Sequence, residues 1–332
     1  MRYAAIPVPE QALRAAITTA KTPAGSKISR GDYNGGLCDI VGTGGDSHST
    51  FNVSTTASLL AAAYLRLAKH GNRASTSASG SADVLLHTQP RAPAILACTA
   101  DRLPALYARS NYVFLMAPVF HPGMAHVAHV RRELGWRTIF NLLGPLANPC
   151  EALIEARLLG VARSELGPVF AETLVLMGAR KAMVVCGREQ LDEISCAGET
   201  DCWLVRGHGR GQGEGPAGIE HVVLSPADFG LGAHRLEDVS SGLRPEENAR
   251  ILMEILSGQT RLDHPIVEFV LMNTAALLAI SGCCETEGAE VLQERGPGGL
   301  RWKEGVRLAK EAIVGGEARR CWDQYVEATH LV

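Results

Sequence analysis

The stretch LCDIVGTGGD, residues 37–46, decides the fold of this chain. It begins with a short, mainly apolar run that predicts a buried strand, and this run leads directly into glycines. Residues 54–65 are mostly small or apolar, which predicts a helix and makes the segment a strand, loop and helix unit. Because similar patterns alternate along the chain, we expect an α/β fold in which helices cover a central, mostly parallel sheet. Further strands are predicted at 65–68, 112–116, 156–161 and 181–186, and further helices at 124–134, 165–177, 246–256, 265–280 and 302–313.

The bulk composition is that of a globular protein with a sizeable core. The 332 residues are 46% hydrophobic and 20% charged, and their net charge is -3. This length fits a large domain that carries a smaller one. Without a basic excess, the overall charge gives no indication of nucleic acid or an anionic membrane as a partner.

Neither the cysteines nor the apolar runs indicate export or a membrane. The nine cysteines lack the CxxC spacing of zinc or thioredoxin-type sites, so we expect reduced, mostly buried thiols. The N-terminal apolar stretch is too short for a secretory signal. The longest apolar run, 269–280, contains Asn273 and Thr274 and is shorter than the roughly 20 residues of a spanning helix, so we expect a buried core helix. A cytoplasmic protein is the expectation that follows.

Residues 42–46, GTGGD, form what we call the glycine loop. Its glycines allow a tight turn and leave N–H groups open to an anion, although such a loop alone more often serves only as a turn. The predicted helix that follows has an N-terminus that favours phosphate oxygens. Its start holds more hydroxyl and amide groups than capping requires. We therefore predict an anion site, to which the following side chains contribute: Thr50, Asn52, Ser54, Thr55 and Thr56.

A second polar segment begins with KHGNR, residues 69–73. Its two firm cations are by themselves more typical of a solvated surface. Small hydroxyl residues follow at 75–81, however, and cations beside small polar residues suit a phosphorylated sugar. Asp46 could accept hydrogen bonds from ribose hydroxyls. Asp83 could do the same or cap a helix, and both interpretations stay open.

Asp192 and Glu193, which we call the acidic pair, lie in LDEIS, residues 191–195, after a predicted strand. Mg2+ prefers hard oxygen ligands and commonly takes one or two carboxylates together with substrate phosphates. Two adjacent acidic residues are more often solvated surface. Only the phosphate site predicted elsewhere in the chain raises the rank of the metal interpretation, and both interpretations stay open on these residues alone.

Five motifs, in their order and spacing, resemble the anthranilate phosphoribosyltransferases: GTGGD (42–46), NVST (52–55), KHGNR (69–73), SGSAD (79–83) and LDEIS (191–195). Residues 117–149 resemble the next block of the same family. The resemblance implies transfer of the phosphoribosyl group from phosphoribosyl pyrophosphate (PRPP) to the amine of anthranilate. The products would be N-(5-phosphoribosyl)anthranilate and pyrophosphate, in tryptophan biosynthesis, with two Mg2+ ions as cofactors.

The resemblance also implies three groups of site residues. The PRPP contacts are Gly42, Gly45, Asp46, Thr50, Asn52, Ser54, Thr55, Lys69, Ser77 and Ser81. The anthranilate contacts are Gly42, His70, Asn72, Pro118, His121, Met124 and Arg131, with Arg131 pairing with the carboxylate and with a purely structural role equally open for His121. The Mg2+ ligands are Ser54, Asp192 and Glu193. No general base is assigned, because an aromatic amine is already nucleophilic.

Members of the family carry a small α-helical domain, through which they usually form homodimers. Only about 40 residues precede the glycine loop, so we expect this domain to be shortened here and the homodimer to be weakened. The expected division is 1–36 and 92–110 for the helical domain, 37–91 for the phosphoribosyl-binding core, and 111–332 for the remaining α/β domain with the metal site.

Three alternatives remain. A pyrimidine nucleoside phosphorylase would share the fold and a glycine-rich phosphate loop, but KHGNR together with LDEIS disfavours it. A non-catalytic, nucleic-acid-binding relative would show a basic groove and lost metal ligands, whereas the net charge is -3 and the acidic pair is intact. A folded but inactive remnant would show the same motifs.

Overall fold

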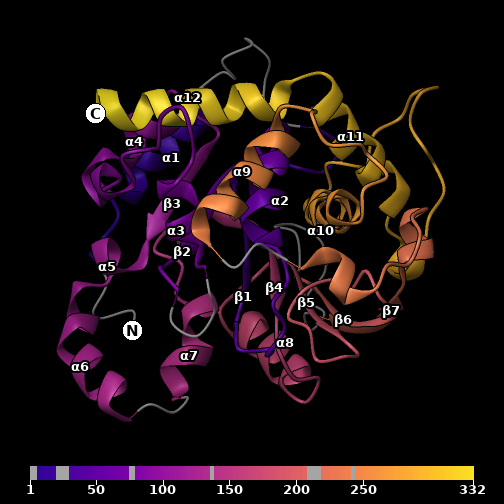
Figure 1. The fold of residues 1–332 in the computed structure, drawn as a ribbon, viewed down its shortest axis with the longest axis horizontal. Helices are drawn as coiled ribbons and strands as arrows, with labels where there is room; N and C mark the ends of the chain where they lie inside the picture. The colour runs from indigo at the N-terminus through magenta and orange to yellow at the C-terminus, as the bar shows by residue number, and fades with distance from the viewer. Residues whose placement is uncertain (1–5, 20–29, 75–78, 135–137, 208–217, 241–243) are drawn as a thin grey trace.

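A seven-stranded sheet in the order β3-β2-β1-β4-β5-β6-β7 forms the centre of the molecule (Figure 1). The structure is a computed structural model that describes residues 6–19, 30–74, 79–134, 138–207, 218–240 and 244–332. The strands are β1 (Leu37–Gly42), β2 (Arg66–Gly71), β3 (Tyr112–Met116), β4 (Ile154–Gly160), β5 (Lys181–Gly187), β6 (Thr200–Arg206) and β7 (Gly218–Leu224). The α-helices are α1 (Glu10–Thr19), α2 (Val53–Ala61), α3 (Ser81–Leu86), α4 (Leu103–Tyr107), α5 (Ala117–Phe120), α6 (Ala125–Leu134), α7 (Ile139–Leu143), α8 (Leu166–Leu176), α9 (Pro245–Leu256), α10 (Pro265–Ser281), α11 (Trp302–Val314) and α12 (Glu317–Leu331).

The sheet is mostly parallel, as predicted. β1 to β5 pair in parallel, whereas β6 and β7 extend the sheet beyond β5 as antiparallel strands. Sequence analysis predicts no strand at either of these two positions. The first four residues of β7 are exposed, so this strand lacks the apolar run by which a buried strand is recognised. The predicted α/β fold class is confirmed.

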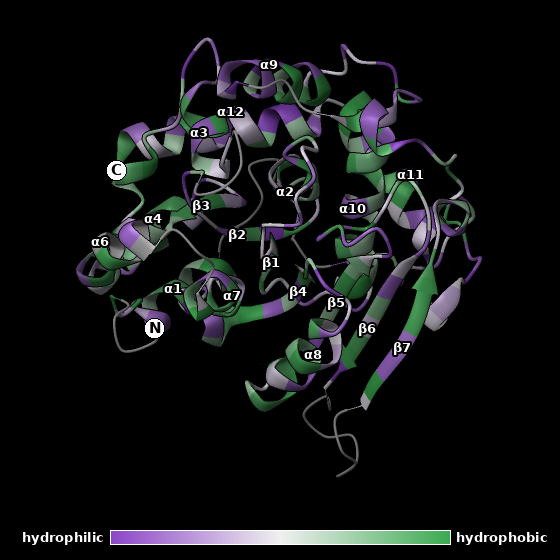
Figure 2. Cartoon of the chain, turned by 60° about the horizontal axis from the view of Figure 1, so that its bottom comes forward, coloured by the Kyte–Doolittle hydropathy of each residue, from purple (hydrophilic) through white to green (hydrophobic). Residues whose placement is uncertain are grey.

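Helix α10 is the buried helix expected from the longest apolar run. It packs against α2, α11 and β4, and nearly all of its residues are buried. In Figure 2, the ribbon of α10 lies between the sheet and α11. No helix among the described residues is both long enough and apolar enough to cross a membrane. α2 ends at Ala61, before the predicted end at residue 65, because the chain turns there to enter β2 at Arg66.

Helix α1 joins the main core although sequence analysis does not single it out. Its buried residues Leu13 and Ile17 belong to the same hydrophobic cluster as the sheet, and α1 packs against α4. Arg66 at the start of β2 reinforces this contact, because its guanidinium donates to the carbonyl oxygens of Ile17 and Gly35. The segments 6–19 and 103–107 therefore lie side by side (Figure 1).

Glu155 on β4 connects the sheet to the segment that precedes β1. Its carboxylate accepts hydrogen bonds from Asn34 N at 3.0 Å and Gly36 N at 2.9 Å, and Lys181 Nζ lies 2.8 Å away. Burial alone would raise the pKa of Glu155, but the hydrogen bonds from Lys181 and the backbone hold it below its usual value. Folding therefore favours the ionised carboxylate.

We expect Glu155→Gln to lower the free energy of unfolding by about 2 kcal/mol near neutral pH, because it leaves Lys181 without its buried partner. The folded pKa lies below the unfolded one, so this stabilisation is present above the usual glutamate range and is lost as pH falls through the folded pKa. Urea unfolding of both proteins at several pH values would measure it. A difference that stays constant into strong acid would contradict the ionic explanation.

Candidate functional site

The candidate site lies where the parallel strands end. Gly42, the last residue of β1, aligns with Gly160, the last of β4, and Gly71 at the end of β2 aligns with Met116 at the end of β3. In open parallel sheets, ligands bind beyond this carboxyl edge, because the loops and helix N-termini meet there. The segments singled out by their sequence follow these strand ends directly.

The glycine loop is held against the acidic pair. Gly44 and Gly45 both have positive φ, 67° and 73°, a conformation that side chains disfavour. The N–H of Thr43 donates to the carbonyl oxygen of Gly160 at 2.9 Å. The N–H of Gly44 donates to Oδ2 of Asp192 at 2.6 Å. The loop thus presents a backbone N–H to a carboxylate oxygen of the acidic pair.

The acidic pair carries more negative charge than its surroundings compensate. Burial raises the pKa of Asp192, and repulsion by Asp46 raises it further. Burial also raises the pKa of Glu193, with repulsion by Asp192 as the next cause, although Glu193 accepts a hydrogen bond from Ser54 Oγ at 2.6 Å. These groups come from the loop after β1, the start of α2 and the loop after β5. Charges crowded in this way attract a cation.

The donor set fits Mg2+. Ser54, Asp192 and Glu193 supply only hard oxygen atoms, and the hydrogen bond between Ser54 and Glu193 places two of them side by side. Among the described residues, no three His, Cys, Asp or Glu side chains are grouped so that they could hold a metal by themselves. Mg2+ tolerates such a sparse set, because it keeps several waters and completes its shell with substrate phosphates.

Lys69 on β2 is a buried cation beside these carboxylates. Burial lowers the pKa of Lys69, while attraction to Asp39, Glu193 and Asp192 opposes this shift. Asp39 is itself buried, and its Oδ2 accepts a hydrogen bond from Asn148 Nδ2 at 2.8 Å. Lys69 is therefore a buried amine that nearby carboxylates attract, not a member of a solvated surface cluster.

The other predicted phosphoribosyl contacts lie in two neighbouring segments. Asn52 Nδ2 donates to the carbonyl oxygen of Ser79 at 3.1 Å, which links the start of α2 to the serine-rich segment. Ser81 Oγ donates to the carbonyl oxygen of Asn72 at 3.1 Å. Thr55 is a buried residue of α2. Thr50 forms an isolated bridge with Ser240, and Ser77 lies outside the described residues.

Asp83 serves as a local cap in this structure. Its Oδ2 accepts hydrogen bonds from Gly80 N at 3.1 Å and from Ala74 N at 2.8 Å, at the start of α3. Of the two interpretations left open, these contacts favour the capping role.

His70 and His121 form a two-histidine cluster near the ends of β2 and β3. Their ring centroids are 5.2 Å apart at an angle of 63°. Burial lowers the pKa of His70 to about 3 and also lowers the pKa of His121, so burial favours the neutral form of both rings. His121 Nε2 is bonded to the carbonyl oxygen of Ala147 at 3.0 Å, which supports a structural role for this residue.

The remaining predicted anthranilate contacts differ in how far their side chains are buried. Met124 is half-buried, and its N–H donates to the carbonyl oxygen of His121 at 3.0 Å. Pro118 in α5 and Asn72 are exposed. Arg131 belongs to α6, and its side chain lies outside the described part of the structure.

Sequence reasoning missed two residues that shape the site. Asp39 interrupts an apolar strand, and this buried charge was the available signal for the contact with Asn148 and Lys69. For Gly160, the sequence held no comparable sign of a role in the site. A Cβ built on Gly160 would overlap the backbone carbonyl of Asp192, and one on Gly42 would overlap the Asp192 carboxylate. Both glycines therefore allow the acidic loop to lie directly over the strand ends.

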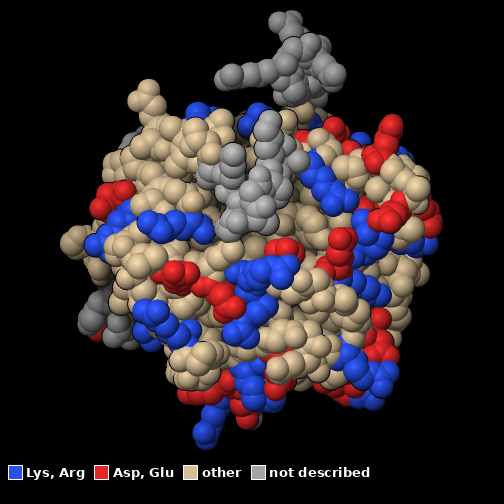
Figure 3. Space-filling model, turned by 90° about the horizontal axis from the view of Figure 1, so that it is seen from above, with Lys and Arg blue, Asp and Glu red and all other residues tan. Residues whose placement is uncertain are grey.

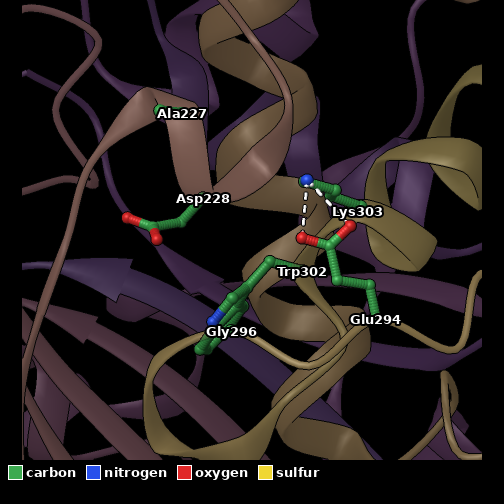
Figure 4. Close-up of a pocket in the computed structure, with 6 residues that line it drawn as sticks. All are labelled: Ala227, Asp228, Glu294, Gly296, Trp302 and Lys303. Atoms are coloured by element: carbon green, nitrogen blue, oxygen red, sulfur yellow. Dashed lines mark hydrogen bonds and ion pairs between the residues drawn. The ribbon is translucent and has the colours of Figure 1, made fainter.

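A small pocket elsewhere in the molecule contains none of these residues. It is lined by Ala227, Asp228, Glu294, Gly296, Trp302 and Lys303. Figure 4 shows Lys303 Nζ against both oxygens of Glu294, at 2.7 and 2.8 Å, with the Asp228 carboxylate turned away from that pair. Asp228 in turn accepts hydrogen bonds from Ser225. These polar groups satisfy one another, so the pocket offers a ligand little.

Comparison with known proteins links this geometry to one family. A model of the "glycosyl transferase family, a/b domain" matches residues 34–319. The anthranilate phosphoribosyltransferase of Schizosaccharomyces pombe is 44% identical over 283 residues, covering 85% of this chain and 72% of that protein. The Saccharomyces cerevisiae enzyme in complex with PRPP and Mg is 34% identical with a TM-score of 0.76, covering 97% of this chain and 80% of that one. The same enzyme in complex with 4-fluoroanthranilate has 32% identity and a TM-score of 0.74, with 97% and 79% covered.

Proposed function

The chain belongs to the anthranilate phosphoribosyltransferase family, and we propose that its reaction takes place between the glycine loop and the acidic pair. The enzyme transfers the phosphoribosyl group of PRPP to the amine of anthranilate, giving N-(5-phosphoribosyl)anthranilate and pyrophosphate, in tryptophan biosynthesis. The observation that carries the placement is the pair of contacts from Gly44 N to Asp192 and from Ser54 to Glu193. They bring the predicted anion site and the predicted metal ligands together, although the two lie far apart in sequence.

The PRPP subsite is proposed at the ends of β1 and β2. Backbone N–H groups of the glycine loop and the N-terminus of α2 favour phosphate oxygens. Lys69 adds a buried amine that is attracted to the acidic pair. The proposed contacts are Gly42, Gly45, Asp46, Thr50, Asn52, Ser54, Thr55, Lys69, Ser77 and Ser81.

The anthranilate subsite is proposed beside the two-histidine cluster. Within the described part of the chain, His121 Nδ1 is buried and has no hydrogen-bond partner, and His70 is buried beside the backbone of Gly144. Buried polar atoms without partners are rare in native proteins and commonly mark a ligand site. Because burial favours the neutral form of both rings, they can contact an aromatic acid without adding charge. The proposed contacts are Gly42, His70, Asn72, Pro118, His121, Met124 and Arg131.

The chemistry requires positioning more than acid–base catalysis. An aromatic amine is already nucleophilic, so the chain needs no general base, and none is assigned. As the bond from ribose C1 to pyrophosphate breaks, negative charge grows on the leaving group, where Lys69 and the loop N–H groups can stabilise it. Mg2+ ions, one held by Ser54 and one by the acidic pair, would supply further charge neutralisation of the pyrophosphate.

Several finer assignments are part of the same proposal. We propose two Mg2+ ions, one at Ser54 and one at the acidic pair, and a cytoplasmic location. We also propose that segments 1–36 and 92–110 form a small helical domain, through which a homodimer would assemble. The packing of α1 on α4 brings these two segments together, within the same hydrophobic core as the sheet. On the face drawn in Figure 3, basic and acidic side chains are interspersed, which gives no support to a nucleic-acid-binding alternative.

Loss of anthranilate fluorescence tests this function. Purified protein with PRPP and Mg2+ is expected to consume anthranilate and to release one pyrophosphate for each anthranilate. Omission of Mg2+ should stop both changes. Folded protein that leaves the fluorescence unchanged would contradict the proposal and would favour the inactive remnant.

We expect Arg131→Ala to raise the KM for anthranilate by roughly 10- to 100-fold, because a charge-assisted pair with the carboxylate is lost. The affinity for PRPP with Mg2+ should change little, since Arg131 is assigned to the other subsite. Initial rates with each substrate varied in turn, together with calorimetry of PRPP binding, would measure both effects. Abolished PRPP binding would show that the two subsites are divided wrongly.

A further inference from the structure

Asn273 is a buried amide in the middle of the apolar helix α10. It is fully buried, and its side chain is bonded to the main chain of Ile194, the residue directly after the acidic pair. Its Oδ1 accepts from Ile194 N at 3.0 Å, and its Nδ2 donates to the carbonyl oxygen of Ile194 at 3.2 Å. Nδ2 also donates to the carbonyl oxygen of Phe269, one turn earlier in the helix, at 3.1 Å.

The two bonds between the Asn273 amide and the main chain of Ile194 have the donor and acceptor pattern of a residue pair in a β-sheet. A buried amide is costly unless it is bonded, and here both of its ends contact a single residue. Because the peptide unit is planar, fixing the N–H of Ile194 also fixes the carbonyl group and the Cα of Glu193. Within the loop between β5 and β6, Gly187 pairs with Leu191, and Ser195 N donates to Thr200 Oγ1. The amide of Asn273 adds a restraint on the backbone of Ile194 itself.

Three other contacts restrain the same short segment. Gly44 N holds the Asp192 carboxylate, Ser54 holds the Glu193 carboxylate, and the Asp192 backbone lies against Gly160. All three act from the side of the strand ends. Asn273 acts from α10, and it is bonded to both main-chain polar groups of the residue that follows the acidic pair.

We propose that Asn273 is a positioning residue, which holds the acidic pair in the orientation that binds Mg2+ with PRPP. It would touch neither the metal nor the substrates and would act through the backbone of Ile194. The identity of the ligand, Mg2+ with PRPP, rests on the proposed function. The restraint on the acidic pair rests on the hydrogen bonds between Asn273 and Ile194.

The variant Asn273→Leu removes the two bonds to Ile194, together with the bond to Phe269, at similar side-chain volume. Calorimetry of PRPP binding in the presence of Mg2+, without anthranilate, is expected to show a loss of affinity of about 10- to 100-fold, which is typical when a group that orients a metal ligand is removed. The Mg2+ concentration for half-maximal turnover should rise similarly. The KM for anthranilate should change by less than about twofold, because that subsite is untouched.

Thr274→Val is the matched control. Thr274 is the next residue of α10 and is equally buried, but its hydroxyl bonds only to the carbonyl oxygen of Val270 in the same helix, at 2.8 Å. The Thr274→Val variant should bind PRPP with Mg2+ as tightly as the unaltered protein does. If both variants lose affinity equally, or if Asn273→Leu loses stability and no affinity, Asn273 is only a structural residue and the proposal is overturned.

Amide hydrogen exchange of the unaltered protein tests the restraint itself. The Ile194 amide should exchange slowly, at least on the order of 100 times slower than an open loop amide, because its partner is buried in α10. Exchange at the rate of an open loop would overturn the proposal even if Asn273→Leu fails to fold. The two proposals are tested separately. Absence of turnover by the unaltered protein would refute the proposed function, whereas the exchange rate of the Ile194 amide tests its contact with Asn273.

Discussion

Asp192→Asn is expected to lower turnover at limiting Mg2+ by at least about 100-fold, while the fold remains intact. The substitution removes a negative charge that would bind the metal, and little else. The asparagine side-chain oxygen can still accept the hydrogen bond from Gly44 N, so the glycine loop keeps its contact.

The stability of this variant distinguishes a metal ligand from a structural carboxylate. In the metal-free protein, burial and repulsion by Asp46 disfavour the charge on Asp192. A neutral side chain should therefore unfold at the same or a higher urea concentration, although activity falls. Glu199→Gln is the control, because Glu199 lies in the same loop but is exposed and pairs with Arg188. Wild-type turnover by Asp192→Asn would remove the metal role, and unfolding at clearly lower urea would indicate a structural one.

The sequence predicted the central elements of this fold because their residues are buried on both faces. β3 and β5 contain continuous apolar runs and β1 is apolar apart from Asp39, and each strand lies at its predicted position within a residue or so. β7 was missed because exposed edge strands lack such runs. α1 was missed although it buries Leu13 and Ile17, since a single short amphipathic helix is a weak signal.

The site was predicted as two separate halves. Spacing and residue type identified the glycine loop and the acidic pair, but nothing in a single sequence states that Gly44 and Asp192, which are 148 positions apart, share a hydrogen bond. The resemblance to a family supplied that connection before the geometry did. Residues that act by leaving space, such as Gly160, have no side-chain signature and could be found only in three dimensions.

Gly160→Ala should have a comparably large effect, although this residue presents no functional group. Its added methyl group would overlap the carbonyl group of Asp192, which is backbone and cannot move aside by changing a rotamer. The loop that carries the acidic pair must shift away from the strand ends. Because a displacement of about 1 Å in an active site can cost 100-fold in rate, we expect turnover to fall by that order even at saturating Mg2+.

Overpacking should also lower the free energy of unfolding of Gly160→Ala by about 1–3 kcal/mol, measured by urea unfolding. Gly198→Ala is the control, because Gly198 belongs to the same loop, and a Cβ built there meets no atom within 4 Å and needs no left-handed backbone. It should retain turnover and stability. Full turnover by Gly160→Ala would show that the acidic pair tolerates displacement. The position of the acidic pair relative to the glycine loop would then not depend on the close contact between Gly160 of β4 and Asp192.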